Sequence, residues 1–145
     1  NTMIKTFRGK LADGSTQRIR LSTNDGLTGY KINKFQICGT VMGSTDDELT
    51  AQIFLQEPAS AIATVNFDNP LLLGVALYND AASGNYGNDL VVIFDSMAFN
   101  QDIYITAKDS SGNSASTNYY IELERIKLDL NGATVATLKD MRGRE

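Results

Sequence analysis

Apolar and polar residues alternate with a period of two along most of the chain. This period is typical of β-strands that bury one face, because successive side chains of a strand point to opposite sides. Residues 48–56 show it most clearly, since every second position is apolar and Phe54 alone interrupts the polar face. The pattern marks ten candidate strands, at residues 2–8, 17–22, 30–38, 48–56, 61–67, 71–78, 90–94, 103–107, 119–129 and 133–138.

Three of these segments depart from simple alternation. Residues 71–78 are apolar at adjacent positions, which indicates a central strand covered on both faces. In residues 30–38 the apolar phase slips by one position at Asn33 and Lys34, which predicts a β-bulge there. The composition of residues 119–129 also suits a helix, but its Tyr-Tyr-Ile start and its period-two ending favour a long strand.

Turn-forming residues separate the predicted strands. Asp13-Gly14 and Asn24-Asp25-Gly26 adopt turn conformations at little cost. Asn131-Gly132 is the strongest hairpin signal, because a type I′ turn needs positive φ at both central positions. Residues 79–89 and 109–117 are rich in Gly, Asn, Ser and Asp, so we expect two exposed polar loops.

The length agrees with one domain that has its own hydrophobic core. A chain of 145 residues buries roughly 70% of the surface that its unfolded form exposes. No internal repeat divides it. We therefore predict a single domain, residues 1–145, that folds as an all-β antiparallel β-sandwich of the jelly-roll type with about eight to nine strands.

The formal net charge of the chain is -4, but its charges are unevenly distributed. Residues 1–34 hold seven Lys and Arg against two Asp, whereas residues 35–107 hold nine Asp and Glu and neither Lys nor Arg. Residues 108–145 hold six charges of each sign. Such a bipolar chain favours a subunit that meets copies of itself, or a charged neighbour, through complementary surfaces.

The composition excludes several classes of chemistry. Histidine is absent, which excludes His-based nucleophilic triads, His metal sites and imidazole pH switches. Cys38 is the only cysteine, so neither an internal disulfide nor a thiolate zinc cluster can form. Cys38 ends an apolar strand, where we expect a buried, inert thiol. We expect no cofactor and no enzymatic activity.

Paired carboxylates are the remaining catalytic possibility. Glu122 and Glu124 share one strand face at a separation of roughly 7 Å, which would suit an inverting glycosidase. However, alternating glutamates next to basic residues are ordinary on a solvent-facing strand, and we favour that interpretation. Asp95 and Asp102 flank a short connection and make no better pair.

Three carboxylate-rich sets could bind calcium: residues 46–48, Asp80 with Asp89, and Asp109 with Asn113. Calcium needs about six to eight oxygen ligands held by fixed backbone. None of the three sets has the spacing of an EF-hand loop. Their residue types are also those that β-turns require, so we interpret them as turns.

Nucleic-acid and membrane partners are disfavoured. The basic N-terminal third could attract phosphates, but the chain as a whole is acidic and has no basic motif interleaved with aromatic residues. We therefore expect no direct contact with nucleic acid. No apolar run approaches the roughly 20 residues of a membrane-spanning helix, so we expect no membrane span.

Three segments carry a resemblance to a known group of proteins. They are MIKTFRGKLADG at residues 3–14, FNQDIYIT at 99–106, and the closing region from NYYIELERIKLDL at 118–130 to ATLKDMR at 136–142. In these segments the chain resembles small jelly-roll virion structural proteins of bacteriophages, which are capsid subunits or capsid decorations. The resemblance implies a multi-copy assembly subunit with no catalytic residues to carry over.

The sequence thus predicts a virion structural protein, assembled in the host cytoplasm, that self-assembles or docks on a viral shell. Its partners would be other copies of the chain or other capsid subunits. The alternative is a non-catalytic carbohydrate-binding or adhesion module with a glycan as its ligand. The predicted assembly contacts are Lys5, Arg8, Lys10, Arg18, Arg20, Arg142 and Arg144, and the predicted contacts on an exposed loop are Asp80, Asn85, Tyr86, Asn88 and Asp89.

Overall fold

The computed structural model describes residues 3–21, 27–41, 46–80, 88–94 and 98–127, and these residues form eight β-strands and no helix. The strands are β1 (Met3–Leu11), β2 (Ser15–Ile19), β3 (Thr28–Cys38), β4 (Asp47–Phe54), β5 (Leu72–Asp80), β6 (Asn88–Ile93), β7 (Ile103–Asp109) and β8 (Thr117–Lys127).

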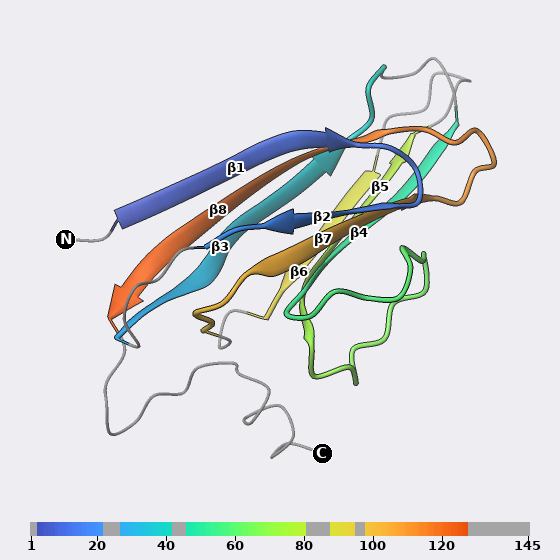
Figure 1. Ribbon diagram of the computed structural model, residues 1–145. Helices are drawn as coiled ribbons and strands as arrows, with labels where there is room; N and C mark the ends of the chain where they lie inside the picture. The colour runs from blue at the N-terminus through green and yellow to red at the C-terminus, as the bar shows by residue number, and fades with distance from the viewer. Residues whose placement is uncertain (1–2, 22–26, 42–45, 81–87, 95–97, 128–145) are drawn as a thin grey trace.

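The strands form two antiparallel sheets that face each other (Figure 1). Sheet A has the order β1-β8-β3, and sheet B has the order β2-β7-β4-β5-β6. Within sheet B, β4, β5 and β6 follow one another and β7 returns to lie beside β4, which is a Greek key. The predicted antiparallel β-sandwich is therefore confirmed for the described part of the chain.

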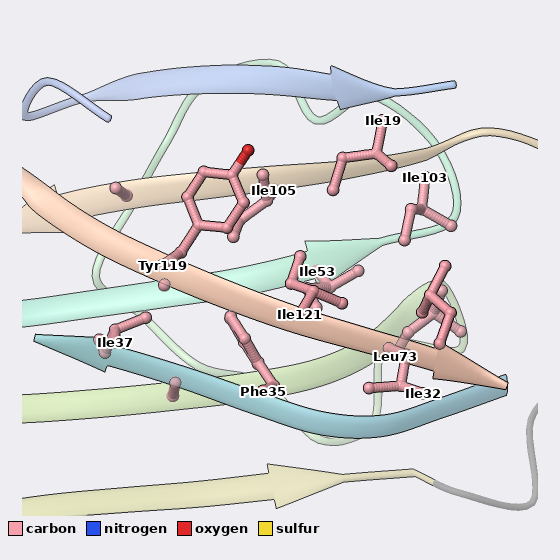
Figure 2. Close-up of a cluster of buried hydrophobic side chains, with 14 of the residues drawn as sticks. Ile19, Ile32, Phe35, Ile37, Ile53, Leu73, Ile103, Ile105, Tyr119 and Ile121 are labelled. Atoms are coloured by element: carbon pink, nitrogen blue, oxygen red, sulfur yellow. The ribbon is translucent and has the colours of Figure 1, made fainter. Parts of the chain in front are cut away.

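Apolar side chains from the inner faces of both sheets fill the space between them. Ile53 in β4, Ile105 in β7 and Ile121 in β8 are completely buried. Burial of one such side chain stabilises the fold by about 1.5–3 kcal/mol, so this layer holds the two sheets together. Figure 2 shows the layer, with Ile19, Ile32, Phe35, Ile37, Ile53, Leu73, Ile103, Ile105, Tyr119 and Ile121 labelled.

Two finer predictions about single strands are confirmed. The register of β3 against β8 shifts between Ile32 and Lys34, where the slip in the apolar pattern places a bulge. Because of this bulge, Ile32 and Phe35 both face the core, although a separation of three residues would otherwise put them on opposite faces. The segment with helix-like composition is strand β8, which buries every second residue from Thr117 to Leu123.

The prediction of a strand at residues 61–67 is wrong. These residues lie over the outer face of sheet B, where Gln52 projects from β4 with only 1% of its surface exposed. Gln52 Nε2 donates to the carbonyl oxygens of Ile62 at 3.2 Å and Thr64 at 3.1 Å. Val65 packs against a small apolar cluster on the same face that includes Phe54. The alternating apolar residues of this segment therefore pack onto a sheet and do not pair within one.

The turn at Asp13-Gly14 leads the chain from β1 in sheet A to β2 in sheet B (Figure 1). Gly14 has a φ of 77°, a conformation that side chains disfavour, and its amide donates to the carbonyl of Ala107 at 2.8 Å. The predicted turn at residues 24–26, the hairpin turn at Asn131-Gly132 and the strand at 133–138 lie outside the described residues.

Candidate assembly surfaces

The strands of the two sheets carry opposite charge. Those of sheet A contain seven Lys and Arg and two Glu, whereas those of sheet B contain two Lys and Arg and five Asp and Glu. Three of the sheet B carboxylates, Asp47, Asp80 and Asp109, are buried, and Glu48 and Asp89 are exposed. The reason is topological, because β1 and β3 come from the basic N-terminal third and β4, β5 and β6 come from the segment without cations. The bipolar charge of the sequence thus becomes a difference between the two layers of the sandwich.

The outer face of sheet A presents cations on its edge strand β1. Arg8 and Lys10 are exposed and point away from the core, since they alternate with inward-facing Phe7. Their partners across the ladder on β8 are Tyr120 and Asn118. Neither partner is an acidic residue, so no carboxylate of the described strands lies directly opposite Arg8 or Lys10, and Glu122, opposite Thr6, is the diagonal neighbour of Arg8.

The cations of β3 on the same face lie beside carboxylates. Lys34 is opposite Glu122 in the ladder. Lys31 Nζ is 3.9 Å from Glu124 Oε1, which also accepts a hydrogen bond of 3.0 Å from Asn33 Nδ2. Glu122 and Glu124, the acid pair considered for catalysis, therefore lie on a solvent-facing strand beside lysines and polar groups.

Lys5 differs from the other basic residues of β1. Lys5 lies two residues before Phe7 and therefore on the same, inward-facing side of β1. Its Nζ lies 5.6 Å from the centroid of the buried Tyr30 ring. This geometry is a cation–π contact. Lys5 thus contacts Tyr30 of the neighbouring part of sheet A within the same molecule.

Arg18 in β2 forms the closest ion pair of the described residues. Its Nη2 is 2.6 Å from Asp102 Oδ2, and its Nε donates to the same oxygen at 2.7 Å. Burial alone would raise the pKa of Asp102, but the hydrogen bond from the Leu21 amide and the charge and hydrogen bond of Arg18 outweigh it and lower the pKa. Arg20, which follows β2, adds to this lowering.

The predicted basic contacts are divided between the two sheets. Lys5, Arg8 and Lys10 lie in sheet A, whereas Arg18 and Arg20 lie in or beside strand β2 of sheet B. The physical reason is the turn at Asp13-Gly14, which sends the chain from one sheet to the other. Arg142 and Arg144 lie outside the described residues.

An open groove of about 390 Å³ lies on sheet B beside its edge strand β6. Its walls include the exposed carboxylates Glu48 and Asp89, and neither Lys nor Arg is among the described residues that line it. Leu90, 57% exposed, is part of its apolar lining. The full lining is Glu48, Leu49, Thr50, Ala63, Leu77, Tyr78, Asn79, Asp89, Leu90 and Ser110.

The surroundings of the groove are electrostatically negative. The pKa of Tyr78 is raised, first by burial and then by the negative charge of Asp80. Cys38, Asp47 and Asp89 raise it further. These carboxylates thus make the end of the groove at Tyr78 negative, while Lys108 on β7 lies opposite the groove-lining Thr50 in the ladder.

Only part of the predicted contact loop reaches the groove. Asp89 lines the groove. Asp80, at the end of β5, lies opposite Asp47 in the ladder and is only 5% exposed, so the prediction that Asp80 is an exposed contact is wrong. Asn88 begins strand β6, which makes the loop shorter than residues 79–89. Asn85 and Tyr86 lie outside the described residues.

Asp109, one of the calcium candidates, organises the connection between β7 and β8. Its carboxylate accepts hydrogen bonds from the amides of Glu48, Ser111 and Ala115 and from the Ser111 hydroxyl, at 2.8–3.1 Å. Burial opposes ionisation of Asp109, but these donors outweigh burial and lower its pKa. The oxygens are used by the protein's own backbone, as the turn interpretation predicts.

Asn113, the partner that the calcium hypothesis gives to Asp109, points elsewhere. Its Nδ2 donates to the carbonyl oxygen of Asp46 at 2.8 Å. Across the described ranges no group of three or more Asp, Glu or Cys is arranged to hold a metal ion. Cys38, expected to be buried, is half-buried at the end of β3.

Sequence patterns could not reveal the groove, because its lining comes from three strands and two connections. The one local signal is Leu90, an apolar residue that alternation assigns to a strand and that the structure leaves exposed at an edge. Glu48 gives no signal, because acidic residues are common at strand ends.

Two comparisons with known proteins found no match for the chain. No protein-family model matches it, and no curated protein matches it significantly. The described part of the chain contains no helix that is long and apolar enough to cross a lipid bilayer.

Proposed function

We propose that this protein is a structural assembly subunit, a capsid or capsid-decoration protein of a bacteriophage virion assembled in the host cytoplasm. The observation that carries the proposal is the pairing of exposed cations, Arg8 and Lys10, on β1 of sheet A with a groove on sheet B that is lined by the exposed carboxylates Glu48 and Asp89. A subunit with complementary surfaces on opposite layers can bind its own copies head to tail. Other capsid subunits with matching charge are equally suitable partners.

The strand pairing supports a jelly roll as the fold of this subunit. In a jelly roll, a long hairpin of eight strands is folded over so that strand 1 pairs with 8, 2 with 7, 3 with 6 and 4 with 5. Three of these pairs, β1-β8, β2-β7 and β4-β5, are present in the described chain. The fourth differs, because β6 pairs with β5 and not with β3. Jelly rolls serve in viral capsids and in lectin domains.

Assembly also accounts for the exposed charged residues that have no partner within the described molecule, whereas the carboxylates considered for catalysis have structural contacts. Glu122 and Glu124 lie on an open strand face beside lysines, and Asp109 and Asp102 are occupied by hydrogen bonds that hold loops. Arg8 and Lys10 on β1 and the side chains of Glu48 and Asp89 at the groove have no such structural task among the described contacts. An intermolecular contact gives both sets a partner.

Light scattering of the purified chain over a range of concentrations tests the proposal. We expect species larger than the monomer that grow with concentration, and regular particles or arrays of them in electron micrographs. A chain that stays monomeric at every concentration, alone and with other virion subunits, would overturn the proposal.

A glycan-binding module is the second candidate, and the groove is the observation that favours it. Its volume of about 390 Å³ falls within the usual range of small-molecule sites, about 300–1,000 Å³. Thr50, Asn79 and Ser110 add groups to its lining that could bind sugar hydroxyls. Glycan binding by a strictly monomeric chain, abolished by Asn79→Ala, would support this candidate over the assembly subunit.

A further inference from the structure

We propose that the acidic groove on sheet B of one copy receives the side chains of Arg8 and Lys10 from the outer face of sheet A of a second copy. The inference rests on the proposed assembly function and names the two surfaces that meet.

The groove has the features of an acceptor for a long cationic side chain. Glu48 and Asp89 supply negative charge at its rim, and Leu77 and Leu90 supply apolar surface in its lining. Lys and Arg combine an aliphatic stem with a charged head, so they can cover apolar surface while the head stays near the rim. Lys108, on the neighbouring strand β7, lies 3.8 Å from Asp13, so its charge has a partner of its own outside the groove.

Strand β1 has the features of the matching donor. Among the described strands it lies at the edge of sheet A, so none of them screens Arg8 and Lys10 on that side. The two residues are separated by one position and therefore project from the same face. Lys31 and Lys34, on the same outer face of sheet A, are less suitable as donors to the groove, because they lie beside Glu124 and Glu122 of their own molecule.

The two surfaces lie on opposite sheets, so one copy cannot use both for the same neighbour. Such a contact is heterologous: each copy binds one neighbour through its groove and another through β1, and growth continues until a ring or shell closes. The charged pairs set the orientation and the rate of encounter. The exposed Leu90 at the groove adds apolar area that the contact buries.

Two charge-reversed variants test the inference when mixed. The groove variant Glu48→Lys/Asp89→Lys keeps an intact β1, and the strand variant Arg8→Glu/Lys10→Glu keeps an intact groove. Each variant alone should lose self-association by about tenfold or more at low salt. An equimolar mixture should restore species larger than a dimer by sedimentation velocity, because each variant repels its own copies whereas both groove–β1 contacts between unlike variants pair opposite charges.

Matched controls separate this contact from a general charge effect. Asp68→Lys reverses an exposed acid of the connection between β4 and β5, and Lys127→Glu reverses an exposed cation at the end of β8. Both controls should assemble as the wild type does, and circular dichroism should show that all variants are folded.

Two other outcomes are distinguishable. If the wild type assembles but the mixture does not regain assembly, or if either reversed variant assembles normally alone, the groove–β1 contact is wrong and the proposed function stands. If the wild type does not associate at all, both fail.

Discussion

At the scale of single residues, carboxylates with many hydrogen bonds hold the connections of this sandwich. Asp109 accepts four hydrogen bonds, one from β4 and three from the connection between β7 and β8, and Asp102 joins Arg18 to the amide of Leu21. A buried acceptor that satisfies several backbone amides is expensive to replace, because each amide left without a partner costs free energy.

Replacement of Asp109 by asparagine should therefore destabilise the fold. The amide group of the new side chain would turn a donor toward amides that themselves need an acceptor, and we expect the free energy of unfolding to fall by about 1–3 kcal/mol. Urea denaturation at neutral pH measures the change. Asp68→Asn, at an exposed position, should stay within about 0.5 kcal/mol of the wild type.

The same residue predicts a dependence on pH. Because the folded state lowers the pKa of Asp109 below its ordinary value of 3.8, its stabilising effect is fully present above that value and is lost as the pH falls through the lower, folded-state pKa. The wild type should lose stability in this acidic range more steeply than Asp109→Asn. Equal acid sensitivity of the two proteins would contradict the role assigned to the carboxylate.

At the scale of elements, the alternation of apolar and polar residues predicts which side chains face an apolar layer. It does not predict whether the segment pairs with other strands in a sheet. Leu49, Ala51 and Ile53 alternate because β4 pairs in the sheet, whereas Val65 and Phe67 alternate because their segment packs on the sheet's outer face. Phe67 makes an edge-to-face contact with Phe94, with ring centroids 5.3 Å apart. The two cases look alike in sequence, because both require apolar residues on one side of an extended chain.

The connection between β4 and β5 should depend on Gln52. Gln52→Glu keeps the shape of the side chain but replaces two donated hydrogen bonds with a carboxylate facing the carbonyls of Ile62 and Thr64. We expect faster amide hydrogen exchange in residues 56–70, with little change in β3 and β8. Thr16→Ser, a mild change elsewhere in sheet B, is the control, and unchanged exchange in residues 56–70 would contradict the anchoring role of Gln52.

At the scale of the whole molecule, the sequence predicts the charge imbalance but not its position in space. The uneven distribution along the chain is visible at once, yet strands distant in sequence become neighbours in a sandwich. β8 illustrates this, because it comes from the neutral C-terminal segment and lies between two basic strands of sheet A, where it contributes Glu122 and Glu124 as well as Arg125 and Lys127. The groove also depends on such long-range neighbours, so only the folded arrangement brings Glu48 and Asp89 to one surface.

The most direct test of the central claim, that opposite charges on the two sheets drive assembly, is the salt dependence of self-association by sedimentation velocity. The Debye length falls from about 30 Å at about 0.01 M salt to about 3 Å at about 1 M, so exposed charges attract far less at high salt. The account predicts large species at low salt that dissociate toward monomers as salt is added. Association that is absent at low salt, or that stays constant or strengthens with salt, would contradict it.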